Sequence, residues 1–139
     1  MDKENISTVA KISRGLFLLF SSVFFIAVLT QIFLAGLAIF VNPVHWMNHT
    51  NFIHLFGFNI PVLLLLLCYL GKLPHWAYLY VFGLISGVFL MYFTANFTDL
   101  IRWIGALHPV IAGFLAILAF QLVKKIILLI FKKRRSEYS

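Results

Sequence analysis

The stretch Gly15–Val41, with the sequence GLFLLFSSVFFIAVLTQIFLAGLAIFV, decides the fold of this chain. Its 27 residues include no Asp, Glu, Lys or Arg. A bilayer core of about 30 Å is crossed by about 20 helical residues. An apolar run this long also exceeds the roughly 7–15 residues of a signal-peptide core. The stretch therefore predicts a membrane-spanning helix that is retained in the protein.

Three further stretches repeat this pattern later in the chain. The whole sequence of 139 residues is 63% apolar and 11% charged, whereas soluble domains are roughly 45–50% apolar and about 25% charged. Backbone groups in lipid must bond within their own segment, which favours helices. We therefore predict an all-α integral membrane four-helix bundle, with spans at 15–41, 51–71, 76–97 and 103–123. The transmembrane domain then covers 15–131, between an N-terminal segment, 1–14, and a basic tail, 132–139.

The basic residues predict the orientation of these spans. Ten of the eleven Lys and Arg residues fall on one side of the predicted membrane, and only Arg102 falls on the other. Cytoplasmic loops carry the excess of Lys and Arg, so we expect both termini in the cytoplasm. The ten residues are Lys3, Lys11, Arg14, Lys72, Lys124, Lys125, Lys132, Lys133, Arg134 and Arg135.

The net charge of +7 comes mostly from the last part of the chain. A basic segment beside a membrane is attracted to anionic lipids by about 1 kcal/mol per basic residue. We expect the tail to bind the anionic inner leaflet. Nucleic acid is not an expected partner, because positive-inside charge already accounts for the basic run.

No acidic residue lies inside any predicted span. Proton-coupled exporters and pumps carry protons on intramembrane carboxylates, so this class is disfavoured. The polar groups that remain near the middle of the spans are Gln31, Asn59 and histidines.

Two histidines are predicted to lie at similar depth on parallel helices. His54 is about one turn inside the second span, and His108 is five residues after Trp103 in the fourth. Two imidazoles facing each other can bind a haem iron from both sides, and bundle cores commonly house such cofactors. We predict His54 and His108 as axial ligands of haem b. The alternative is that each is a hydrogen-bonded packing residue.

Small and polar neighbours complete this predicted haem site. Gly57, Gly105 and Ala112 are spaced three or four residues from the two histidines, so they leave room for a flat macrocycle on the same helix face. A ligating imidazole also donates its other N–H to an acceptor. Gln31 and Asn59 are the predicted acceptors.

A second pair of histidines offers an alternative metal site. His45 and His49 are four residues apart and would share one helix face, where they suit a zinc or copper ion. The same spacing fits a hydrated helix at the membrane surface, and the sequence supplies no clear third ligand.

Several motifs resemble a known family. The segment Gln31–Leu37 (QIFLAGL), Trp46 with the histidines that follow it, and Ala106–Val110 (ALHPV) are similar to a bacterial family of four-helix membrane proteins catalogued as domain of unknown function 6220. The resemblance implies a bacterial cytoplasmic membrane and no particular activity. The arrangement of His54 and His108 also resembles one half of haem A synthase. The Arg that usually follows each histidine there is replaced by Leu55 and Pro109, and the catalytic Glu has no counterpart.

These observations lead to one main functional hypothesis and two alternatives. We expect a small membrane protein that binds haem b and transfers electrons to or from a membrane redox partner near the outer face. The chain could instead be a non-enzymatic accessory or assembly subunit of a larger membrane complex. The third hypothesis is a small transporter or lipid-binding protein. The sequence leaves open whether the protein is an enzyme.

Overall fold

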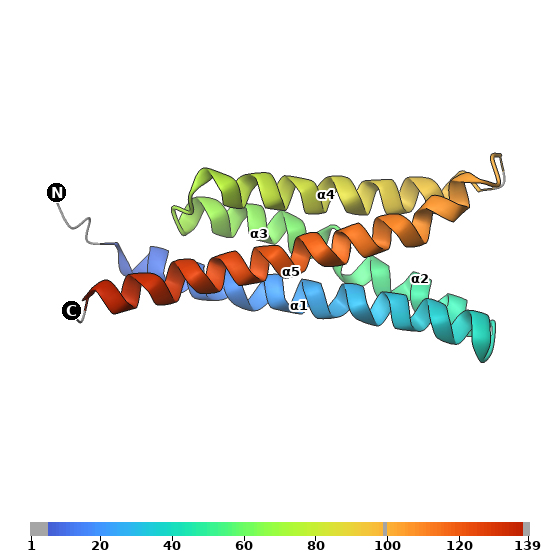
Figure 1. Ribbon diagram of the computed structural model, residues 1–139, viewed down its shortest axis with the longest axis horizontal. Helices are drawn as coiled ribbons and strands as arrows, with labels where there is room; N and C mark the ends of the chain where they lie inside the picture. The colour runs from blue at the N-terminus through green and yellow to red at the C-terminus, as the bar shows by residue number, and fades with distance from the viewer. Residues whose placement is uncertain (1–5, 99, 138–139) are drawn as a thin grey trace.

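Four apolar rods lie side by side in the computed structural model, and one of them is broken into two helices (Figure 1). The structure describes residues 6–98 and 100–137, with residues 132–137 as backbone only. Lys3, the side chains of the predicted basic tail and its last two residues lie outside this description. In chain order the helices are α1 (Thr8–Phe40), α2 (His45–Phe56), α3 (Asn59–Leu70), α4 (His75–Asn96) and α5 (Ile104–Glu137).

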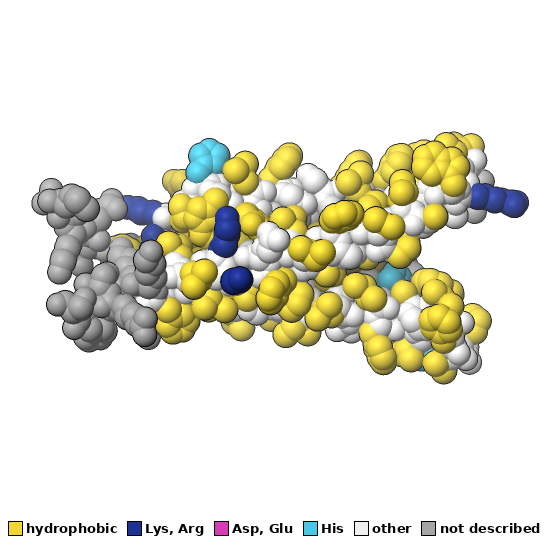
Figure 2. Space-filling model, in the orientation of Figure 1, with side chains coloured by type: hydrophobic (Ala, Val, Ile, Leu, Met, Phe, Trp, Pro, Cys, Tyr) yellow, Lys and Arg dark blue, Asp and Glu magenta, His cyan; other side chains and the backbone are white. Residues whose placement is uncertain are grey.

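The four rods confirm the predicted all-α four-helix architecture. Each is long and apolar enough to cross a membrane, with α2 and α3 together forming the second rod. Large apolar side chains cover much of the surface, as Figure 2 shows along the length of the bundle. In a bilayer this surface would contact lipid tails, because water would hydrate it only at a high cost in free energy.

The second rod breaks at Gly57 and Phe58 for a local reason. Pro61 has no backbone N–H, so it cannot donate to the carbonyl of Gly57 one turn earlier. The side chain of Asn59 instead donates to the carbonyl of Leu55 at 2.9 Å and approaches that of His54 at 3.4 Å. These bonds supply partners for the carbonyls of His54 and Leu55 near the end of α2.

The tightest packing lies in the half of the bundle that contains α3. Phe17 and Phe24 of α1 are fully buried there, and Phe24 meets Phe56 edge-on at 5.7 Å between ring centroids. Gly83 and Gly87 of α4 let α5 approach. A Cβ at these positions would lie 2.9 and 2.8 Å from the ends of Leu118 and Leu115. We call this region the packed half; it comprises Phe17–Val28, α3, Ala77–Val88 and Leu115–Ile126.

The turn between α3 and α4 closes the packed half at the end where both chain termini lie (Figure 1). Lys72 has a positive φ of 46°, and Leu73 N–H donates to the carbonyl of Cys68 at 3.0 Å while Lys72 N–H donates to Tyr69 at 3.1 Å. This is the Schellman pattern that ends many helices. Arg14 reinforces it, because its guanidinium donates to the carbonyls of Gly71 at 2.8 Å and Lys72 at 3.0 Å.

Candidate functional site: a polar layer in a notch of the bundle

The other half of the bundle is open rather than packed. Figure 2 shows a notch between two arms at the end opposite the termini, with a histidine side chain at its base. One arm contains α2 with the end of α1, and the other contains the end of α4 with the start of α5 (Figure 1). Among the described residues, the backbone of α2 does not come within 8 Å of α4 or α5, counted between Cα atoms. Side chains therefore make the contacts across this gap.

Gln31 and His49 join α1 to α2 by a reciprocal pair of hydrogen bonds. The side-chain amide of Gln31 donates to the backbone carbonyl of His49 at 3.0 Å, and His49 Nδ1 lies 3.1 Å from the backbone carbonyl of Gln31. A carbonyl oxygen can only accept, so Nδ1 must carry the proton. In a neutral imidazole this leaves the Nε2 lone pair of His49 available.

His108 of α5 is held in the same way against α4. Its Nδ1 lies 3.1 Å from the backbone carbonyl of Met91 and 3.1 Å from Thr94 Oγ1. Thr94 donates its own proton to the carbonyl of Leu90 at 2.9 Å, which leaves its oxygen free to accept. The Nδ1 of His108 is therefore also the protonated nitrogen, and its Nε2 carries the lone pair.

These two histidines meet across the notch. The ring centroids of His49 and His108 are 6.4 Å apart, with an angle of 56° between the ring planes. Within the described residues, neither Nε2 has a hydrogen-bond partner. Two imidazoles on opposite sides of one metal ion, each about 2 Å from it, have centroids about 6 Å apart. The observed separation matches that arrangement.

His54, the partner predicted for His108, has a different neighbour. Its Nδ1 is 3.1 Å from the hydroxyl of Tyr92, and the ring centroids are 5.8 Å apart. His54 is exposed, whereas His108 is half-buried beside His49. The structure thus brings His49, rather than His54, to His108. The predicted pairing of His54 with His108 has no contact that supports it.

The other predicted site residues lie around the notch in various roles. Gly57 is buried against Ile53 of its own helix, and Gly105 lies against Thr98, so neither opens towards His49 and His108. Ala112 is buried one turn after His108. Asn59 binds backbone carbonyls at the helix break rather than an imidazole. His45 pairs with Asn48 at 3.1 Å, while His49 is bound to α1 through Gln31.

Gln31 carries the one enclosed polar atom without a partner among the described side chains. Its residue is 8% exposed, and its Oε1 accepts no hydrogen bond. An unpaired buried acceptor costs about 1–3 kcal/mol. Because the Nε2 of the same amide binds the His49 carbonyl, Oε1 belongs to the layer that holds the imidazoles. We call His49, His108, Gln31 and Thr94 the polar layer.

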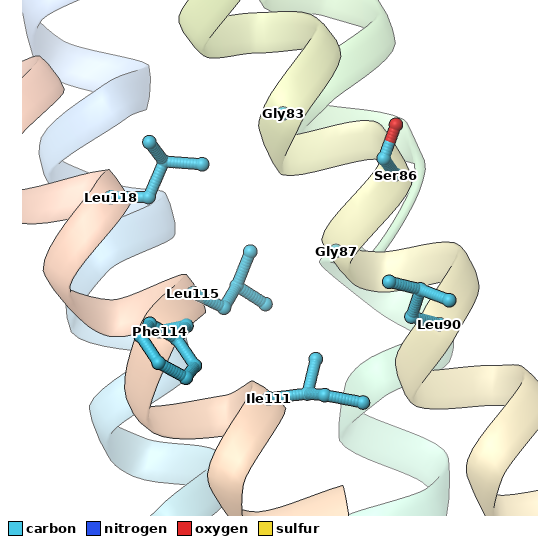
Figure 3. Close-up of a pocket in the computed structure, with 8 residues that line it drawn as sticks. All are labelled: Gly83, Ser86, Gly87, Leu90, Ile111, Phe114, Leu115 and Leu118. Atoms are coloured by element: carbon cyan, nitrogen blue, oxygen red, sulfur yellow. The ribbon is translucent and has the colours of Figure 1, made fainter. Parts of the chain in front are cut away.

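A second concave feature lies between α4 and α5, outside the polar layer. It has a volume of about 250 Å³ and is lined by apolar side chains, the two packing glycines and Ser86 (Figure 3). No ionisable group lines it. This groove can accommodate apolar atoms, but it supplies no group for acid–base or metal chemistry.

The notch offers a metal ion two protein ligands, His49 and His108. In the described part of the chain, no three His, Cys, Asp or Glu side chains cluster closely enough to bind a metal ion. A structural zinc site usually takes four protein ligands, and a catalytic one takes three. A haem iron needs only one or two, since the macrocycle supplies the other four nitrogens.

The fold and the notch define a multi-pass membrane protein with a polar layer between its helices. Within that class, residues 31–99 match the model of the family of unknown function DUF6220. The match confirms the resemblance to this family that the sequence suggests. It covers Gln31 and the histidines of α2, and it ends before the Leu107–Pro109 motif. No curated protein and no solved structure matches the chain.

One sequence feature, the distance from the nearest interfacial tryptophan, distinguishes His49 from His54. Interfacial tryptophans mark membrane depth, and His49 follows Trp46 by three residues, close to the five between Trp103 and His108. His54 follows Trp46 by eight residues. Depth counted from these tryptophans favours His49 as the partner of His108.

Proposed function

We propose that this protein binds haem b in the notch and transfers single electrons within the membrane. His108 and His49 would hold the haem iron through their imidazoles. The observation that carries the proposal is the pair of imidazoles 6.4 Å apart, each with Nδ1 on a backbone carbonyl. A ligating histidine characteristically donates its other N–H to such an acceptor.

The separation of α2 from α4 and α5 supports haem over a bare metal ion. A macrocycle needs a flat space between its two ligands, and here the Cα atoms of α2 stay more than 8 Å from those of α4 and α5 among the described residues, while the two imidazole centroids are 6.4 Å apart. A bound haem would supply one-electron redox chemistry. The chain would hold and orient the two imidazoles, with Gln31 fixing His49 and Met91 and Thr94 fixing His108.

The proposed orientation places the notch at the outer face of the bacterial cytoplasmic membrane. The start of α1, which contains Lys11 and Arg14, and the α3–α4 turn, which contains Lys72, lie at one end of the bundle, and the α4–α5 connection, which contains Arg102, lies at the other (Figure 1). The positive-inside tendency then puts the first of these ends in the cytoplasm, where the basic tail meets anionic lipids.

Cysteine labelling tests this orientation. In a Cys68→Ala background, Pro43→Cys in the α1–α2 connection should react with a membrane-impermeant maleimide in intact cells. Lys72→Cys should react only after the cells are opened. The reverse pattern would refute the proposed orientation without bearing on haem binding.

An absorption spectrum tests the proposed function. Protein purified in mild detergent after expression with added haem should show a Soret band that shifts on reduction. His108→Ala should weaken that band, whereas His75→Ala, at the far end of α4, should leave it unchanged. A colourless wild-type protein, beside a membrane cytochrome that keeps its haem under the same conditions, would refute haem binding. The accessory-subunit hypothesis would then lead.

A further inference from the structure

We propose that the face between α4 and α5 binds one anionic phospholipid, with its phosphate beside Lys125 and an acyl chain in the apolar groove. The groove is the concave feature of about 250 Å³ between these helices (Figure 3). Phe114 at its rim is 68% exposed, whereas Leu115 at its base is buried, so an apolar chain can enter from the surface of the bundle. The polar layer is not part of this site, and the proposal does not depend on haem.

The groove continues into a line of paired positions that runs along both helices towards the end where the chain termini lie. Successive pairs are three or four residues apart on each helix. Residues at that spacing are neighbours on one helix face, so the pairs form a single antiparallel seam. In order they are Gly87 with Leu115, Gly83 with Leu118, Tyr80 with Gln121, and Trp76 with Lys125. A molecule that lies in the groove and extends past Leu118 therefore meets Gln121 first and Lys125 second.

Lys125 supplies a positive charge at the end of this seam. Its Nζ lies 4.8 Å from the ring centroid of Tyr80 and 5.2 Å from that of Trp76, which is within the range of a cation–π interaction. The two rings therefore hold the ammonium group against α4. Lys125 is exposed, and no Asp or Glu occurs in residues 5–98 or 100–136. An anionic lipid head group supplies the negative charge that this part of the chain lacks.

Gln121 adds hydrogen-bond donors one turn closer to the groove. Its Oε1 accepts from the Tyr80 hydroxyl at 3.1 Å, which leaves the two N–H groups of Nε2 as donors. Nε2 has no hydrogen-bond partner in the part of the chain that the structure describes. The ester carbonyls of a phospholipid are acceptors that lie between its phosphate and its acyl chains. Gln121 has the same place between Lys125 and the groove.

The length of the site matches one leaflet of a bilayer. Ile111, at the far end of the groove, and Lys125 are 14 residues apart on α5, which is about 21 Å along the helix axis. A bilayer with its head groups is about 40–45 Å thick. With Lys125 at the level of the phosphates, Ile111 therefore lies near the middle of the bilayer, where an acyl chain ends. Trp76 beside Lys125 fits this depth, because tryptophans concentrate at membrane interfaces.

The test is native mass spectrometry of the purified full-length protein in detergent. The protein is titrated with dioleoyl phosphatidylglycerol, which is anionic, or with dioleoyl phosphatidylcholine, which has no net charge. The first phosphatidylglycerol should bind about fivefold more tightly, because one basic residue contributes about 1 kcal/mol to attraction of an anionic lipid. Lys125→Gln should remove this preference. Lys11→Gln, which removes the same charge from an exposed position on α1, should keep it.

A second variant and a competitor test the groove. Ser86→Leu places a larger apolar side chain in the groove, so it should weaken binding of both lipids and leave the ratio of their affinities unchanged. Ser22→Leu, on α1 outside the groove, is the matched control and should bind both lipids as the wild type does. Glycerol phosphate carries a phosphate but no acyl chain, and at equal concentration it should not displace phosphatidylglycerol.

Several results would overturn the proposal. One is equal affinity of the wild-type protein for the two lipids; another is a preference that Lys125→Gln retains or that Lys11→Gln also removes. Displacement by glycerol phosphate would indicate a site for free phosphate. A wild-type dimer that becomes a monomer in Ser86→Leu would make a second copy of the chain the occupant. If Ser86→Leu does not fold, the comparison of the two lipids in the wild type and Lys125→Gln still decides.

Discussion

The packed half and the notch use the same helices in opposite ways. In the packed half, α4 and α5 approach so closely that Leu115 and Leu118 occupy the space over Gly83 and Gly87. At the notch, the backbone of α2 stays more than 8 Å from α4 and α5 among the described residues, and His49 reaches His108 only through its side chain. One half is built from contact between helices, the other from contact across a gap.

This contrast separates the region that holds the helices together from the region of the proposed haem site. Association of helices in lipid depends on van der Waals packing and small residues, because lipid tails are as apolar as the side chains. The packed half satisfies that requirement with Phe, Leu, Gly and Ala. The notch lacks such packing and contains the polar layer instead. The proposed haem site lies in this less tightly packed region.

The largest expected effect is at the notch. His49→Ala should abolish most haem binding, because a lost ligand costs more than the about 10–100-fold typical of a lost outer partner. His54→Ala should keep its haem, since His54 contacts Tyr92 instead. The haem-to-protein ratio from a pyridine haemochrome assay measures both. Loss of haem in His54→Ala, with retention in His49→Ala, would restore the pairing predicted from the sequence.

A substitution in the packed half should lower stability without touching the site. Phe24→Ala removes a fully buried ring from the edge-on contact with Phe56, and should lower the free energy of unfolding by about 3 kcal/mol. Phe33→Ala, at a side chain 64% exposed on the same helix, should change it little. Unfolding in mixed SDS micelles measures both. Equal effects would show that the two halves are not packed differently.

Loss of the Arg14 contacts should have a smaller effect. Arg14→Gln removes a guanidinium that donates to the carbonyls of Gly71 and Lys72. At about 0.5–1.5 kcal/mol for each hydrogen bond, the two bonds sum to about 1–3 kcal/mol. Because the contact with Lys72 is exposed, the free energy of unfolding should fall by an amount near the lower end of that range. Lys11→Gln, on an exposed part of α1, is the matched control. An Arg14→Gln protein as stable as the control would show that α3 ends stably without the guanidinium.

The smallest expected effect is a gain in stability. Lys72 has φ 46°, a conformation that costs a non-glycine residue about 1–2 kcal/mol. Lys72→Gly removes that cost but adds freedom to the unfolded chain worth about 0.4–1 kcal/mol, so the net gain should be about 0.5 kcal/mol. Lys124→Gly, inside α5, should instead destabilise by about 1 kcal/mol. A loss of stability in Lys72→Gly would contradict this account of the turn.

Much of the fold follows from the sequence alone. Four runs without ionised residues, each about as long as a bilayer is thick, predict four helical rods because unpaired backbone groups are too costly in lipid. The turn at Gly71 and the break near Pro61 also follow local rules, since each depends on residues within one helical turn.

The partner of His108 could be decided only by the tertiary structure. Sequence spacing places His54 and His49 on the same helix, five residues apart, and each lies at a plausible depth. Which of them faces α5 depends on the rotation of α2 about its axis, which the contacts of α2 with α1 set through Gln31. The sequence therefore determined that the chain forms four helical rods long and apolar enough to cross a membrane, because that depends on length and composition. The rotation and spacing of the helices determined which side chains meet.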